Sequence, residues 1–209
     1  MTIDIKSPAV RFESGLTNPS TDYGSDKQET TTVVTFGVPR GGTTMVAGVV
    51  QRCGVNIGVG LPDNLEDPDF TKRDLNKLRA AIRSRNQQYS LWGWKFPRAA
   101  TYLLDIQEEL VNPKYLVVWR DPLAISFRGF RRGEVPHEIL TRIVNIQKQN
   151  IDVMKKLKGA VLNISYERAV KEPQRTAGMI ADFIGADRIN DEGELREFVK
   201  PGAYKPIEI

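Results

Sequence analysis

The sequence lacks the features that would indicate a disulfide-stabilised, secreted or membrane protein. Its 209 residues include a single cysteine, which excludes an intrachain disulfide and gives no sign of an oxidising compartment. The polar first thirty residues lack the apolar core of a signal peptide, and no apolar run approaches the length needed to span a bilayer. These absences favour a cytoplasmic enzyme without a membrane span.

A strong excess of charge of one sign is also missing. Lys and Arg number 30 against 26 Asp and Glu, a formal charge of +4, while 40% of the residues are hydrophobic and 27% charged. That balance is typical of a soluble globular protein, and the positive excess is too small for a nucleic-acid or membrane surface. It suits a protein that holds a polyanionic small molecule, so we expect no nucleic-acid partner.

Strand-like and helix-like segments alternate along most of the chain. Residues 1–30, rich in Ser, Thr, Asp, Pro and Gly, predict an irregular lead-in to a single domain over residues 31–209. Strands are predicted at residues 31–36, 89–95, 115–119 and 160–165. Helices are predicted at residues 43–53, 75–82, 98–110, 139–157 and 175–184, and the tail has no clear period. This alternation predicts an α/β fold with a parallel sheet.

A glycine-rich loop without a lysine follows the first predicted strand. Its glycines allow successive backbone N–H groups to turn inward, and the next helix directs the positive end of its dipole at the same point. The spacing of Gly37, Gly42 and Thr44 is that of the nucleotide-triphosphate loop, but Thr43 stands where that motif needs Lys. The loop therefore predicts a phosphate ligand and argues against ordinary ATP or GTP chemistry.

Polar, chemically distinctive side chains also follow the other three predicted strands. They lie at residues 95–98, 120–121 and 166–167. Because the carboxyl ends of parallel strands lie along one edge of a sheet, where such folds bind ligands, we expect the four loops to converge on one crevice.

In their order and spacing these segments resemble the sulfotransferases that use 3′-phosphoadenosine 5′-phosphosulfate (PAPS). The loop from Pro39 to Thr44 is similar to the 5′-phosphosulfate loop of that family, and the strand at 115–119 followed by Arg120-Asp121-Pro122 is similar to its 3′-phosphate segment. The segments at 92–98 and 164–173 resemble the bacterial, carbohydrate-directed branch. The resemblance covers roughly residues 32–185 and implies a three-layer, P-loop-like fold with helices on both faces of a central parallel sheet.

The resemblance also implies a donor site for PAPS. The residues that it assigns to donor binding are Pro39, Arg40, Gly41, Gly42, Thr43, Thr44, Arg120, Ser126, Arg128 and Tyr166. Arg40 takes the place of the family's loop lysine, Arg120 reads the 3′-phosphate and Tyr166 contacts the adenine. No metal is expected, because a sulfuryl group carries less charge than a phosphoryl group and can be held by cations and main-chain amides.

Two departures from the family pattern leave alternatives open. The family serine follows the arginine by eight residues, whereas Ser126 follows Arg120 by six and Arg128 occupies the usual place, so either residue is a candidate for the 3′-phosphate. No histidine follows Lys95, which is expected to stabilise the transferring group. A carboxylate must then take the acceptor's proton. Glu66 is the preferred catalytic base and Asp69 the second choice, while His137, the lone histidine, reads as a surface residue.

The sequence thus predicts transfer of a sulfuryl group from PAPS to a hydroxyl of a small molecule or glycan, with a carbohydrate or glycolipid as the expected acceptor. A P-loop kinase-like phosphoryl transferase and a non-catalytic nucleotide-binding relative remain as alternatives. Two absences argue against the kinase: the loop has no lysine, and no strand end carries a clear carboxylate that could bind Mg²⁺. Neither the identity of the acceptor nor the oligomeric state can be read from the pattern.

Overall fold

A four-stranded parallel sheet forms the centre of the structure, a computed structural model that describes residues 30–130, 136–189 and 192–199. The strands are β1 (Thr31–Gly37), β2 (Leu91–Lys95), β3 (Pro113–Trp119) and β4 (Ala160–Ser165). Their order across the sheet is β2-β1-β3-β4, and each neighbouring pair is parallel. The predicted α/β class is confirmed, and β3 lies inside the sheet as its continuous apolar run indicates.

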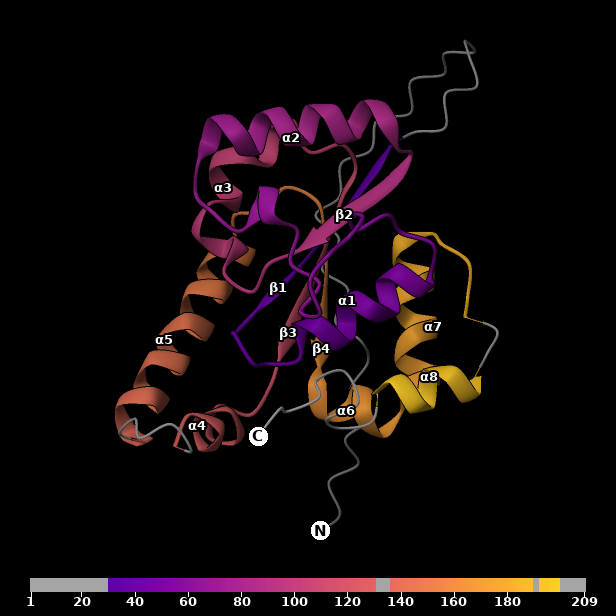
Figure 1. The fold of residues 1–209 in the computed structure, drawn as a ribbon. Coiled ribbons are helices and arrows are strands. Elements are labelled where there is room, and N and C mark those ends of the chain that lie inside the picture. Colours follow the sequence, from indigo (N-terminus) through magenta and orange to yellow (C-terminus); the bar gives the residue numbers. More distant parts are fainter. Residues whose placement is uncertain (1–29, 131–135, 190–191, 200–209) are drawn as a thin grey trace.

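Helices cover both faces of this sheet (Figure 1). On one face lie α2 (Leu75–Gln88), α3 (Leu103–Ile106) and α5 (Pro136–Met154), and on the other lie α1 (Thr43–Arg52), α7 (Pro173–Ile184) and α8 (Glu192–Val199). The remaining helices are α4 (Pro122–Phe130), α6 (Tyr166–Lys171) and the short 3₁₀ turns η1 (Pro68–Phe70), η2 (Ala99–Thr101) and η3 (Gln107–Glu109). The chain is thus folded in three layers, helices, sheet and helices.

The strands alternate their side chains between two separate cores. Val33 packs with α1 and α7, whereas its neighbour Val34 packs with α2 and α3. The same alternation places Leu116 in the first core and Val117 in the second. Because both faces are covered, every position of a central strand can be apolar, which explains why the strands read as short continuous runs.

One predicted helix is wrong. Residues 98–110 form η2, α3 and η3 in succession instead of a single helix. The break falls at Tyr102, which is 1% exposed and has φ −139° and ψ −10°. Its hydroxyl donates to the carbonyl of Phe70 at 2.8 Å and accepts from the indole of Trp94 at 3.0 Å. These tertiary contacts hold the Tyr102 ring in the core, and the backbone at Tyr102 departs from regular helix geometry.

The tail contains a helix that the sequence pattern did not predict. α8 buries Leu195 and Val199 against the core on the α1 side of the sheet. The fit is close, since a Cβ on Gly48 of α1 would overlap the ring of Phe198. An eight-residue helix has only this i, i+4 pair as its signal, which is too short a pattern to stand out.

Several smaller predictions can be checked against the structure. Cys53 is buried in the core, and burial raises the pKa of its thiol. None of the helices in the described ranges is long and apolar enough to cross a bilayer.

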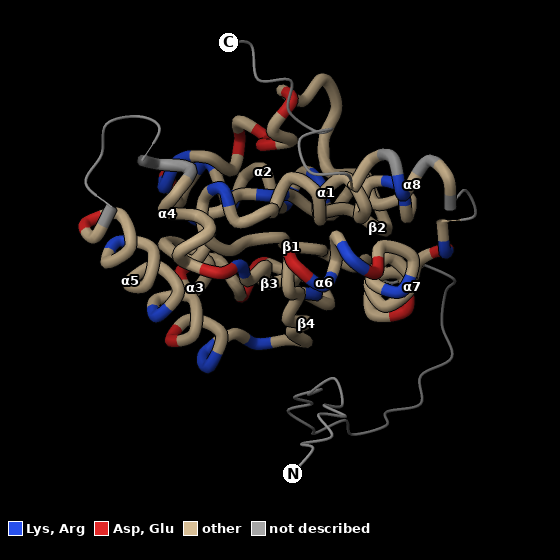
Figure 2. Tube along the Cα trace, turned by 90° about the horizontal axis from the view of Figure 1, so that it is seen from below, with Lys and Arg blue, Asp and Glu red and all other residues tan. Residues whose placement is uncertain are grey.

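Figure 2 shows basic and acidic positions mixed along α5 and α7, in keeping with the small net charge. The predicted lead-in at residues 1–29 lies outside the described residues, and the single-domain boundary stays a prediction.

Candidate active site

The loops after the four parallel strands meet at one edge of the sheet, and three contacts join them. The amide of Gly37, at the end of β1, donates to the carbonyl of Pro97 after β2 at 3.2 Å. A guanidinium nitrogen of Arg120, after β3, donates to the carbonyl of Arg40 at 3.3 Å. The amide of Asp121 donates to the carboxylate of Glu167, after β4, at 3.0 Å. The expected convergence of the four loops is confirmed.

The glycine-rich loop brings the backbone to the start of α1. Gly42 has φ +97°, in the left-handed region, and caps α1 without a side-chain hydrogen bond. The first amides of an α-helix have no intrahelical acceptor, so those at the start of α1 can bind an anion. Thr43 and Thr44 are buried beneath the loop, whereas Arg40 is exposed and also has a positive φ of 65°. A non-glycine residue in this region carries strain of the kind that collects at binding sites.

A chain of contacts leads from this loop to the end of β2. The hydroxyl of Thr44 donates to the carbonyl of Asn64 at 3.3 Å. The side-chain oxygen of Asn64 in turn accepts from the amide of Glu66 at 3.2 Å, across Leu65 with φ +56°. The Glu66 carboxylate oxygen Oε1 then lies 2.8 Å from Nζ of Lys95. The turn around Leu65 therefore directs Glu66 at the end of β2.

Lys95 is the most deeply buried cation of this edge. Its side chain is 1% exposed, against 22% for Glu66. Removal of an ammonium from water is costly unless an opposite charge lies close, so the pair is a strong local constraint. The alternative carboxylate, Asp69, lies elsewhere, 3.6 Å from Arg85 with its side chain 60% exposed. Of the two candidate bases, the structure brings only Glu66 against Lys95.

Arg120 is held by the groups around it. Its guanidinium carbon lies 4.2 Å from the centre of the Tyr166 ring, a cation–π contact. Its buried Nε has no hydrogen-bond partner among the described residues, and its own carbonyl accepts from Gln147 of α5 at 2.9 Å. Tyr166 itself is 6% exposed and lies against Gly42, where a Cβ would overlap its ring. Tyr166 thus connects the glycine-rich loop to Arg120.

The two candidates for the 3′-phosphate both lie on α4. Asp121 caps this helix, accepting from the amide of Ala124 at 2.7 Å, as the Asp-Pro pair at its start predicts. The side chain of Ser126 is buried, and its hydroxyl donates to the carbonyl of Leu123 at 2.8 Å within the same helix. The side chain of Arg128 lies outside the described part of the chain. The choice between Ser126 and Arg128 stays open.

Gln147 belongs to this site although no sequence motif singled it out, whereas Asn64 and Asp67 belong to the segment Asn64-Leu65-Glu66-Asp67, a weak match to an acidic element between the glycine-rich loop and the strand that ends at Lys95. Asn64 and Gln147 each bind the backbone of a predicted site residue, and Asp67 forms a buried ion pair with Arg85 at 2.8 Å. The contact of Asn64 with Glu66 has a signal in the sequence. An Asn side chain favours a turn in which its oxygen accepts a hydrogen bond from the backbone amide two residues later. Within the described ranges, no group of three or more His, Cys, Asp or Glu side chains is placed to hold a metal ion.

Comparisons with known proteins give a match in structure and none in sequence. Neither models of known families nor curated protein sequences match the chain. The sulfotransferase domain of the olefin synthase from Synechococcus PCC 7002 is similar with a TM-score of 0.58 and 17% identity, over 88% of this chain and 83% of that one. The chain has the fold of a sulfotransferase domain. Mouse sulfotransferase SULT7A1 complexed with PAP has a TM-score of 0.49 and 16% identity, over 84% and 66% of the two chains.

Proposed function

We propose that this protein transfers a sulfuryl group from PAPS to a hydroxyl of a small molecule or glycan, with a carbohydrate or glycolipid as the acceptor. One observation carries the proposal. The Lys95–Glu66 pair stands beside a phosphate loop without lysine, to which Thr44 and Asn64 connect it. In a sulfotransferase fold, this arrangement offers a cation and a base next to an anion-binding helix start.

The donor is proposed to lie across the loops after β1 and β3. The amides at the start of α1, with Arg40, Thr43 and Thr44, hold the 5′-phosphosulfate, and the guanidinium of Arg120 binds the 3′-phosphate. In support, Arg120 already contacts the carbonyl of Arg40, so the two proposed phosphate sites adjoin. Ser126 or Arg128 adds a second group to the 3′-phosphate. Tyr166, whose ring lies against Gly42 and Arg120, contacts the adenine.

The proposed reaction is an in-line displacement at sulfur. The acceptor oxygen forms a bond to sulfur while its proton passes to the Glu66 carboxylate, and the bond from sulfur to the 5′-phosphate oxygen breaks. The electron pair of that bond leaves with the product, adenosine 3′,5′-bisphosphate (PAP). Lys95 and Arg40 stabilise the charge that develops on the transferring group and the leaving oxygen. The contact with Lys95 uses Oε1 of Glu66, and the carboxylate has a second oxygen that can accept the proton.

Nucleotide binding separates this proposal from its rivals. Titration of the protein with PAP and with Mg-ATP should show a clear preference for PAP, because only PAP carries a 3′-phosphate for Arg120. A preference for Mg-ATP would instead support a phosphoryl transferase. Incubation with ³⁵S-labelled PAPS and a panel of hydroxyl acceptors then tests turnover. If PAP binds tightly and label never leaves the donor, the protein is a non-catalytic nucleotide-binding relative.

A further inference from the structure

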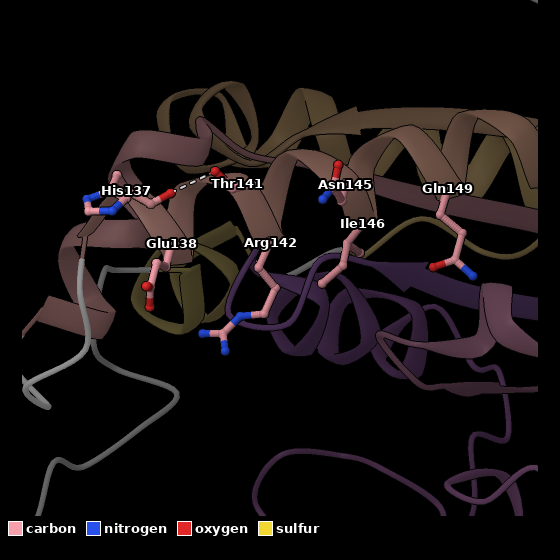
Figure 3. A pocket seen from close by; sticks show the side chains of 7 residues that line it. All are labelled: His137, Glu138, Thr141, Arg142, Asn145, Ile146 and Gln149. Carbon is pink, nitrogen blue, oxygen red and sulfur yellow. Dashed lines mark hydrogen bonds between the residues drawn. The ribbon is translucent and has the colours of Figure 1, made fainter.

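A pocket of about 480 Å³ lies along one side of α5, outside the proposed donor residues (Figure 3). Seven of the described residues line it, and six of these have polar side chains. They are His137, Glu138, Thr141, Arg142, Asn145, Ile146 and Gln149. Sites for small organic ligands generally enclose about 300–1,000 Å³, so the pocket has room for a ligand of one or two sugar units.

The helix that borders this pocket touches the loops after three of the four strands. Ile146 packs on a buried cluster that includes Val38 of the glycine-rich loop. Gln147, next along the helix, donates to the carbonyl of Arg120 at 2.9 Å. α5 also contacts η2 (Ala99–Thr101), which begins four residues after Lys95. Figure 3 shows Arg142, Ile146 and Gln149 extending from α5 toward the indigo ribbon that begins with β1.

The chemistry of the lining suits a ligand with many hydroxyl groups. Asn145 and Gln149 each offer an amide that both donates and accepts, Thr141 adds a hydroxyl, and Glu138 adds a carboxylate acceptor. Ile146 supplies an apolar surface for the C–H face of a sugar ring, and no Phe, Tyr or Trp belongs to the lining among the described residues.

We propose that this pocket is the acceptor site, that its ligand is a sugar unit, and that Asn145 and Gln149 select it through their side-chain amides. The inference rests on the proposed sulfuryl transfer to a carbohydrate, and it adds the location of the acceptor site and two specificity residues. Both side chains are exposed on α5, so their replacement leaves the core intact.

The test compares Asn145→Ala and Gln149→Ala with Lys148→Ala, a change of an exposed residue of the same helix that does not line the pocket. With saturating PAPS, the probes are the methyl glycosides of glucose and galactose, lactose, and p-nitrophenol as an aromatic alcohol. We expect each amide variant to raise KM about tenfold for the sugar that accepts the sulfuryl group, because one hydrogen bond to that sugar is lost. The affinity for PAP should not change. Lys148→Ala should leave both quantities unchanged.

A second measurement does not depend on turnover. The side-chain NH₂ signals of Asn145 and Gln149, identified by their loss in the two variants, should shift when the sugars are titrated and stay in place with p-nitrophenol. Sulfation of p-nitrophenol and of none of the sugars would overturn the ligand class, and unchanged KM in both amide variants would overturn the location. Failure of the wild-type protein to bind PAP would refute the proposed function, and the NH₂ signals would still decide whether the pocket binds sugars.

Discussion

The ammonium of Lys95, at the end of β2, lies 2.8 Å from the carboxylate oxygen Oε1 of Glu66. The two residues belong to different segments, the edge strand β2 and a turn, and the sequence suggested a catalytic role for each independently. Their contact gives the turn a fixed place at the edge of the sheet. It also means that stability and the proposed chemistry depend on the same pair, so the two effects need separate measurements.

Removal of Glu66 should lower the free energy of unfolding more than removal of Lys95. Glu66→Ala takes away the carboxylate that faces a buried ammonium, and loss of one partner from a buried ion pair costs about 3–5 kcal/mol. Lys95→Met keeps the volume of the side chain and leaves behind a carboxylate that is 22% exposed and can hydrate, so we expect a smaller loss. Urea denaturation of the two variants measures the difference, and equal losses would contradict it.

Substitution of Glu66 by Gln should separate the proposed catalytic role from the structural one. The amide has the size of the carboxylate but cannot take a proton, so turnover should fall by about 10²- to 10⁴-fold. Affinity for PAP should stay within a few-fold of the wild type, since Glu66 is not proposed to touch the donor. Single-turnover assays with ³⁵S-labelled PAPS test this directly. An unchanged rate would remove Glu66 from the mechanism and direct attention to Asp69 or His137.

Arg120→Ala should weaken binding of PAP far more than binding of adenosine 5′-phosphosulfate, which has no 3′-phosphate. The loss of charge-assisted hydrogen bonds to phosphate predicts an affinity about 10- to 100-fold lower for PAP. Calorimetric titration of both nucleotides measures the contrast. Arg120 also contacts the carbonyl of Arg40, so a small common loss is expected for both ligands. A loss of equal size for the two would show that Arg120 does not read the 3′-phosphate.

Tyr166 should act through its ring, which lies against Gly42 and beneath the guanidinium of Arg120. Tyr166→Ala removes both contacts and should lower the affinity for PAP about tenfold, whereas Tyr166→Phe keeps the ring and should have the smaller effect. A double-mutant cycle with Arg120→Ala checks the route. If Tyr166 supports Arg120, its effect on PAP shrinks in the Arg120→Ala background. Full additivity would place Tyr166 in an independent role.

Stability should decline in alkaline solution because of two buried tyrosines. Burial raises the pKa of Tyr102 and of Tyr115 above the usual range. Above about pH 10 the unfolded chain loses these protons while the folded chain keeps them, so the free energy of unfolding falls as pH rises. The hydroxyl of Tyr115 has no hydrogen-bond partner among the described residues, so Tyr115→Phe is the cleaner variant. Urea unfolding should show a shallower decline for Tyr115→Phe, by about 1 kcal/mol per pH unit.

Much of the fold could be predicted because its signals are local. The strands at β1 and β4 and the helix ending before Gly185 follow from short apolar runs, helical spacing and a glycine in the left-handed region. The region around Tyr102 could not be predicted in the same way. Its apolar spacing matches a helix, and the helix is interrupted where Tyr102 forms hydrogen bonds to Phe70, 32 positions away, and to Trp94 on β2.

The candidate site, like the fold, has features that the sequence predicts and features that only the tertiary structure shows. The sequence by itself determined the order of the four polar loops and their arrival at one sheet edge, since parallel strands leave no other place for them. Only the tertiary structure decided that Glu66 faces Lys95, that Asp69 pairs with Arg85, and that Tyr166 lies between Gly42 and Arg120. These relations depend on how a turn and a ring pack across loops, and periodicity and motif spacing contain no information on such distances.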